Sequence, residues 1–169
     1  MPIPDPGHFF DQGERLIRSP LPGPTRQVDL RRAISAAYYG VFHFTCAALA
    51  DHVVGSTHRS SPHYPLVYRS VDHRALRELC QGIIRPTPPP KLGRHLPSGG
   101  VGRDMVAFAG IVTEMQDRRH RADYDPTARF SRNDGNAAVA AGRSAVRRFR
   151  ASPAAERASF LTLLLCPPR

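Results

Sequence analysis

The sequence is short of cysteine and of long apolar runs, and both shortages narrow the classes of protein that fit it. Among 169 residues, no two of Cys46, Cys80 and Cys166 have the spacing of a zinc site. Such scattered thiols are typical of the reducing cytoplasm, where we expect this protein to act. No apolar run approaches the roughly 20 residues of a membrane span. The N-terminal MPIPDPGHFF also lacks the basic and apolar regions of a signal peptide, so we expect no membrane segment.

The motifs of common cofactor-dependent enzymes are missing as well. No P-loop, dinucleotide-binding glycine motif, G-x-S-x-G or H-E-x-x-H pattern occurs in the chain. We therefore expect neither a metal nor an organic cofactor.

Acidic residues are also scarce, because 14 Asp and Glu stand against 24 Lys and Arg, for a formal net charge of +10. This balance favours a polyanionic partner, which is nucleic acid, an acidic membrane surface or an acidic protein. The alternative is that the arginines only keep the protein soluble.

The alternation of apolar and polar residues that marks β-strands is nearly absent, and Ala, Arg and Leu dominate the periodic segments. The pattern predicts a single all-α domain over residues 1–169, folded as an up-and-down bundle of five to six helices. A turn is expected over 19–25. The expected helices run from Asp5-Pro6 to Ser19-Pro20, over 28–54, over 66–84, from Asp104 to Tyr124, over 137–150, and from Ser152-Pro153 to Cys166.

The helix over 28–54 is apolar on nearly every face between Ala33 and Leu49, so we expect it to be buried at the centre of the bundle. Gly40 interrupts it at a cost of about 1 kcal/mol in helix propensity. A close approach by a neighbouring helix would explain this glycine.

The segment 85–103 has the sequence RPTPPPKLGRHLPSGGVGR, which is rich in proline and glycine. We expect a long, mobile, irregular insertion there, without a regular helix.

The helix that ends at Tyr124 carries a basic segment, QDRRHRADYDP (116–126). Its apolar residues recur at spacings of 3, 4 and 3, and this stripe extends by steps of 4 to Arg119 and then Asp123. We therefore expect Arg119 and Asp123 to face the core, while Arg118 and Arg121 reach solvent. The apolar stripe consists of Met105, Phe108, Val112 and Met115.

The central helix has a matching polar stripe, in which Arg32, Tyr39 and His43 recur at spacings of 7 and 4. If the two helices pack together, Tyr39 and His43 would meet Arg119 and Asp123 in a shallow polar cleft. A purely structural role is the alternative.

In that structural alternative, Arg119 and Asp123 form a plain ion pair, and His43 is a hydrogen-bonded core histidine. Tyr124 would be a core aromatic with its hydroxyl at the edge, and the exposed arginines would be a solvated face.

Two segments resemble the HEPN-domain superfamily. AISAAYYGVFHFTCAALADH (33–52) is similar to its YYa-x-Fh helix, and RHRADYDP (119–126) is similar to the R-x-x-ADY helix end of its small stand-alone members. The resemblance covers roughly 28–150. It implies an up-and-down helical fold, a homodimer and a role with RNA.

Active HEPN ribonucleases need no metal and carry R-x₄₋₆-H at this helix end, often followed by Tyr. The resemblance implies a phosphate-stabilising role for Arg119 and a site role for Tyr124. The motif departs here, because the residue five positions after Arg118 is Asp123. An aspartate, with an ordinary pKa of about 3.9, is a poor replacement for the proton-transferring His.

Only His43 or His120 could stand in for the missing histidine, and His120 points about 100° away from Arg119 on an ideal helix. Arg118, Arg121 and His120 are the candidate phosphate contacts.

Three functions stay open. The first is an RNA-associated HEPN-like protein, such as the toxin or effector ribonuclease of a two-component defence system. The second is a non-enzymatic helical module that partners an acidic antitoxin or a nucleotidyltransferase. The third is a basic helical protein unrelated to HEPN.

Overall fold

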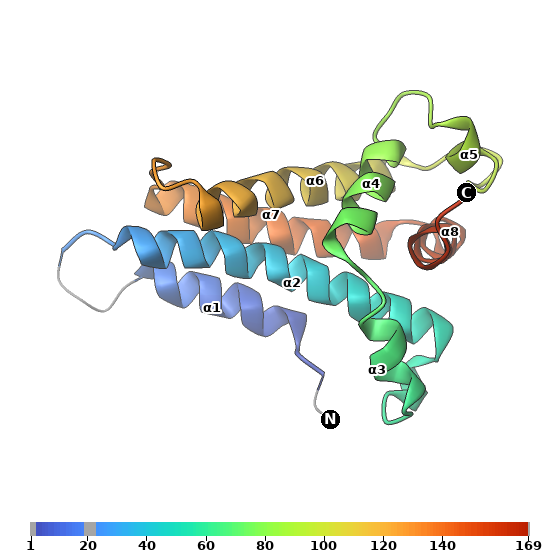
Figure 1. Ribbon diagram of the computed structural model, residues 1–169, viewed down its shortest axis with the longest axis horizontal. Helices are drawn as coiled ribbons and strands as arrows, with labels where there is room; N and C mark the ends of the chain where they lie inside the picture. The colour runs from blue at the N-terminus through green and yellow to red at the C-terminus, as the bar shows by residue number, and fades with distance from the viewer. Residues whose placement is uncertain (1–2, 19–22, 169) are drawn as a thin grey trace.

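The computed structural model describes residues 3–18 and 23–168, and the regular structure in them is entirely helical (Figure 1). This confirms the predicted all-α bundle. The described residues form more helices than the five to six expected, partly because one expected helix is divided. The elements are α1 (Pro6–Arg18), α2 (Gln27–Val53), the 3₁₀ helix η1 (Ser56–His58), α3 (His63–Tyr68), α4 (His73–Ile83), α5 (Pro90–Gly93), α6 (Arg103–Tyr124), α7 (Arg132–Ala151) and α8 (Ala154–Leu165).

Four long helices form the up-and-down bundle. Helices α1 and α6 run toward one end, at the left of Figure 1, and α2 and α7 start there and run away from it. Helix α2 packs against α1, α6 and α7, so it occupies the centre as predicted. Helix α4 lies across α6, and α8 closes the opposite end.

Short-range signals fix several helix ends. Asp5 accepts the Gly7 N–H at 2.8 Å before α1, and Ser131 and Asp134 form a capping box at the start of α7. Asp125 leaves the helical region before Pro126, so α6 stops at Tyr124 as expected. Ser19-Pro20, the expected stop of the first helix, and most of the turn over 19–25 lie outside the described residues.

The single helix expected over 66–84 is wrong, because two helices, α3 and α4, occupy this part of the chain. The break occurs where Asp72 takes an extended conformation and accepts the Ala75 N–H at 2.7 Å. An aspartate in that position starts a new helix rather than continuing the old one.

The segment 85–103 is not irregular throughout, because α5 forms one helical turn inside it. Pro90 stands at the first turn of α5, where its missing N–H costs nothing. Leu92 is buried and packs over Gly82 of α4, so this turn belongs to the core. The mobility of the remaining segment stays a prediction.

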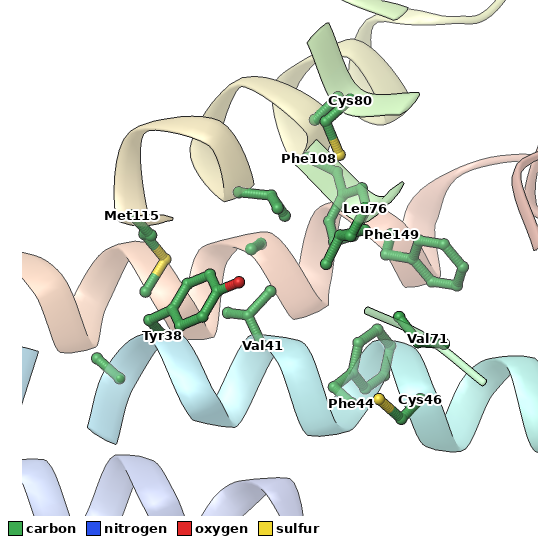
Figure 2. Close-up of a cluster of buried hydrophobic side chains, with 14 of the residues drawn as sticks. Tyr38, Val41, Phe44, Cys46, Val71, Leu76, Cys80, Phe108, Met115 and Phe149 are labelled. Atoms are coloured by element: carbon green, nitrogen blue, oxygen red, sulfur yellow. The ribbon is translucent and has the colours of Figure 1, made fainter. Parts of the chain in front are cut away.

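The core is built around one face of α2 (Figure 2). Tyr38, Val41 and Phe44 point toward side chains of α4, α6 and α7, which include Phe108 and Phe149. The rings of Phe108 and Phe149 meet edge to face at 5.0 Å between centroids, a favoured aromatic geometry.

The close approach predicted at Gly40 is present. Any Cβ there would lie 2.6 Å from the ring of Phe10 on α1, and a Cβ at Gly142 on α7 would lie 2.5 Å from the same ring. The Phe10 ring is therefore wedged between two glycines.

Helix α2 is long and apolar enough to cross a membrane by length and composition, but 72% of its most apolar 18-residue window is buried among the other helices. A mostly buried core helix and a signal sequence near the N-terminus can both have this length and composition, so these two properties alone do not assign α2 to a membrane.

Candidate functional site

Arg119 and Asp123 form the inward-facing pair that their spacing on α6 predicts. The Arg119 guanidinium lies 3.4 Å from Asp123 Oδ2, and the two side chains keep 11% and 20% of their surface exposed. The backbone of Asp123 is more open, because it lies in the last turn of the helix. Asp123 also accepts a 2.5 Å hydrogen bond from the Ser35 hydroxyl of α2. The carboxylate therefore ties the end of α6 to the central helix.

The Arg119 guanidinium also rests on two aromatic rings of α2. Its Cζ is 5.3 Å from the centroid of Tyr38 and 5.9 Å from that of Tyr39, within the range of cation–π attraction. The expected meeting of Arg119 with Tyr39 is thus present. The buried Nε of Arg119 has no hydrogen-bond partner among the described residues.

His43 does not join this pair, contrary to the expected cleft. Its Nδ1 lies 2.7 Å from the Tyr68 hydroxyl of α3, and its ring stacks on Phe9 of α1 at 4.8 Å. Burial lowers the pKa of His43 below its usual range. It is therefore a neutral, hydrogen-bonded histidine on the α1 and α3 side of the helix, as in the structural alternative.

His73 is the histidine that sequence reasoning missed. It is the first residue of α4, and its Nδ1 lies 2.7 Å from the Tyr38 hydroxyl. Its ring lies 4.0 Å from that of Phe42. Burial, together with the charge of Arg119, lowers the pKa of His73. The Asp72 cap could have revealed the start of α4, but not the partner of His73 across the bundle.

Of the other candidate site residues in the basic segment, one arginine forms an ion pair and the rest are exposed to solvent. Arg118 is 41% exposed and forms an ion pair with Glu114 at 2.7 Å, so it is less free than expected. Arg121 is exposed, and no ion pair to it is found in the described part of the chain. His120 is exposed and its ring contacts that of Tyr124, which is 66% exposed and therefore not a core aromatic.

Arg31 of α2 holds the C-terminal end of α6, a role that sequence reasoning also missed. Its guanidinium donates to the carbonyls of Ala122, Asp125 and Ala128 at 2.6–2.8 Å and stacks over the Phe130 ring. These carbonyls lie at and beyond the helix end, where carbonyls lack helical partners. No local signal marks an arginine that acts on residues more than 90 positions later.

A shallow pocket of about 440 Å³ runs along the seam between α2 and α6. We call it the seam pocket. It is lined by Tyr39 and Asp123 of the predicted polar cleft and by Arg32 of the same polar stripe, and it lacks His43 and Arg119. Its lining consists of Val28, Arg31, Arg32, Tyr39, Ala122, Asp123 and Tyr124.

The side chains around the seam pocket suit contact with an anion better than proton transfer. Arginine supplies donors to phosphate oxygens, and exposed aromatic rings supply stacking surfaces.

Within the described ranges 3–18 and 23–168, no group of three or more His, Cys, Asp or Glu residues is placed to hold a metal ion. No family model matches this chain, and neither a curated protein nor a solved structure matches it at a significant level.

Proposed function

We propose that the protein binds RNA through the end of the bundle where α1 and α6 stop and α2 and α7 begin. We call this surface the basic end. The observation that carries the proposal is a group of exposed arginines with no ion pair among the described residues. They are Arg15 and Arg18 in the last turn of α1, Arg26 and Arg32 near the start of α2, Arg121 in the last turn of α6, and Arg129 in the connection to α7.

Unpaired arginines on one surface attract the phosphate backbone and release its counterions on binding. The exposed rings of Tyr124 and His120 add stacking surfaces for unpaired bases, which are the usual targets in RNA. The HEPN resemblance supports RNA as the polyanion. The same resemblance is our basis for proposing that the protein is a cytoplasmic effector in a two-component defence system.

The positions of His43, His120 and Asp123 favour RNA binding over RNA cleavage by these side chains. His43 hydrogen-bonds Tyr68 away from Arg119, and His120 is exposed beside Tyr124. Asp123 is occupied by Ser35 and Arg119. Incubation of the purified protein with RNA and EDTA, beside Arg119→Ala, should leave the RNA intact in both samples. Metal-independent cleavage that Arg119→Ala abolishes would establish a ribonuclease instead.

Filter binding of single-stranded RNA at two salt concentrations tests the RNA-binding proposal. The double variant Arg121→Ala/Arg129→Ala should bind more weakly and should flatten the salt slope by about 0.7 for each lost phosphate contact. The matched control is Arg85→Ala/Arg103→Ala, which removes two exposed arginines, one just after α4 and one at the first residue of α6, far from the basic end. Equal losses in both double variants would mean that net charge alone drives binding, and absence of binding would reject the proposal.

The second candidate is a non-enzymatic interaction module, which the aromatic setting of His43 favours. Its partner would be a second copy of the chain, an acidic antitoxin or a nucleotidyltransferase. Light scattering of the purified protein tests the homodimer. The mass of a monomer at micromolar concentration would exclude a second copy of the chain as the partner.

A further inference from the structure

We infer that a pocket between α3 and the start of the chain binds a small aromatic carboxylate. Its lining comes from residues 59–69 and from Ile3 and Pro4, and we call it the α3 pocket. Its volume of about 350 Å³ is within the usual range for small-ligand sites. The pocket follows the C-terminal end of α2, whereas the basic end lies where α2 begins. The inference therefore goes beyond the proposed function and does not depend on it.

The sequence of α3 supplies the apolar part of the lining. Pro62 precedes α3 and Pro65 lies in its first turn, where the missing N–H of proline costs no helical hydrogen bond. Tyr64 and Tyr68 are four residues apart, so they project from one face of the helix. The pocket is lined by these four side chains together with Ile3, which lies on the same side of the bundle (Figure 1).

The hydroxyls of both tyrosines are already used inside the bundle. Tyr64 donates to Oδ1 of Asp51 at 2.9 Å, and the Tyr68 hydroxyl lies 2.7 Å from Nδ1 of His43. Burial raises the pKa of Tyr64 to about 12 and raises the pKa of Tyr68 far above its usual range. Both side chains therefore stay neutral and do not repel an anion. They offer the pocket the surfaces of their rings, against which a flat ligand can pack.

The polar edge of the α3 pocket is positive. Arg59 and Arg69 line it, and none of the Asp and Glu residues that the structure describes does so. Asp51, behind the pocket, binds Nε and Nη2 of Arg59 at 2.9 and 2.6 Å and offsets that charge. Arg69 is exposed, and its Nε donates to the Pro65 carbonyl at 3.1 Å. Its two terminal nitrogens have no partner among the described residues, so the charge of Arg69 is uncompensated.

This arrangement selects the class of ligand. An apolar lining favours an apolar body, and the planar guanidinium of Arg69 matches the two oxygens of a carboxylate. The hydroxyl of Ser60, which has no partner within the described ranges, is a further donor at the same edge. A cationic ligand would be repelled by Arg69. A ligand with several negative charges would meet only one uncompensated cation, so a monocarboxylate fits best.

Titration of the ¹⁵N-labelled protein, followed by amide NMR shifts, tests the site with three probes. They are 2-naphthoate, its neutral analogue 2-naphthamide, and acetate, which carries the charge without the ring. We expect 2-naphthoate to bind with a dissociation constant of about 1 mM or below and to shift amides within 59–69. The other two probes should bind about tenfold more weakly, because each lacks one half of the interaction.

Two results would overturn the inference. One is the absence of shifts within 59–69 at millimolar 2-naphthoate. The other is equal affinity for 2-naphthoate and 2-naphthamide, because the pocket would then not recognise the carboxylate.

Two variants separate the charge from the apolar lining. Arg69 is exposed and Ile3 lies outside the core cluster, so Arg69→Ala and Ile3→Ala should both keep the fold. Arg69→Ala should weaken 2-naphthoate binding about tenfold and leave 2-naphthamide binding unchanged. Ile3→Ala should weaken both about fivefold. The control Arg85→Ala, which removes an exposed arginine just after α4, should change neither. Equal 2-naphthoate affinity in Arg69→Ala and the parent would reject the site.

The α3 pocket and the basic end can fail independently. Arg69→Ala should bind single-stranded RNA as tightly as Arg85→Ala does, because both remove one arginine away from the basic end. If 2-naphthoate binds as stated and RNA does not bind, the α3 pocket stands and the RNA-binding proposal is wrong. If RNA binds and 2-naphthoate does not, only the α3 pocket is wrong.

Discussion

The hydroxyl oxygen of Tyr38 lies 2.7 Å from Nδ1 of His73, and this hydrogen bond joins the middle of α2 to the first residue of α4. Burial raises the pKa of Tyr38 far above its usual range, so the hydroxyl keeps its proton. No other acceptor for the Tyr38 hydroxyl is found among the described residues, so its buried proton is hydrogen-bonded only when Tyr38 donates to Nδ1, and the single N–H of a neutral His73 is then on Nε2. The bond ties the start of α4 to the central helix.

Removal of this hydroxyl should destabilise the fold. Tyr38→Phe leaves Nδ1 of His73 without its donor in a partly buried position, which costs about 1–2 kcal/mol. Urea unfolding measures the loss. Tyr39→Phe is the matched control, because no hydrogen bond of its hydroxyl is found among the described residues, and it should cost less than about 0.5 kcal/mol. Equal losses in the two variants would contradict the role of the bond.

Acidification should destabilise the protein before its carboxylates titrate. The pKa values of His43 and His73 are both lowered in the folded state from an ordinary value of 6.5. Below pH 6.5 the unfolded chain binds more protons than the folded one. The free energy of unfolding therefore decreases as the pH is lowered, and it becomes constant below the pKa values of the two histidines in the folded state.

This pH effect can be measured by urea unfolding between pH 7.5 and 5. The variant His43→Gln/His73→Gln should lose most of the dependence, while His8→Gln/His120→Gln, which changes two exposed histidines, should retain it. A dependence that survives the first double variant would assign it to other groups.

Loss of Arg119 should be structural in its effect. Arg119→Ala removes the partner of Asp123 and the guanidinium over Tyr38, and we expect a loss of about 2 kcal/mol, below the cost for a fully buried pair because Asp123 keeps some solvent. Arg118→Ala/Arg121→Ala should change the free energy of unfolding by less than about 1 kcal/mol, since Arg118 has only a surface ion pair. Thermal or urea unfolding of the two variants measures both losses. A larger loss in Arg118→Ala/Arg121→Ala than in Arg119→Ala would show that the inward and outward faces of α6 are assigned wrongly.

Two glycines in long helices should respond in opposite directions to alanine. At Gly40 a Cβ would press on the Phe10 ring, which Gly142 blocks from the other side, so Gly40→Ala should destabilise by about 1–2 kcal/mol despite better helix propensity. At Gly110 no atom other than those of its chain neighbours and its own helix backbone lies within 4 Å of the Cβ position. Gly110→Ala should therefore stabilise the protein by about 0.5–1 kcal/mol in the same unfolding assay. A stabilised Gly40→Ala would show that the Phe10 ring can move.

The features predicted well from sequence are those that depend on residues close together in the chain. The burial of α2, the end of α6 before Pro126 and the inward direction of Arg119 all follow from spacing and local conformational preference. The tight site at Gly40 also followed, because a glycine within an apolar helix needs a packing reason.

The features missed depend on which elements meet in space. His43 was expected beside Arg119, one turn beyond Tyr39, but α3 and α1 cover that turn and supply Tyr68 and Phe9. His73 takes a place near Arg119 because α4 crosses α6 there. A helical wheel gives the direction of a side chain, and only the tertiary fold gives its partner.

The hold of Arg31 on the carbonyls of Ala122, Asp125 and Ala128 has a consequence for how the chain folds. The last turn of α6 can complete its hydrogen bonds only after α2 has docked, because the donor lies 91 residues earlier than Ala122. Contacts of such high sequence separation form late and slow the search. Fraying of this helix end is thereby coupled to the whole bundle, and amide hydrogens in the last turn should exchange with deuterium through global unfolding rather than local opening.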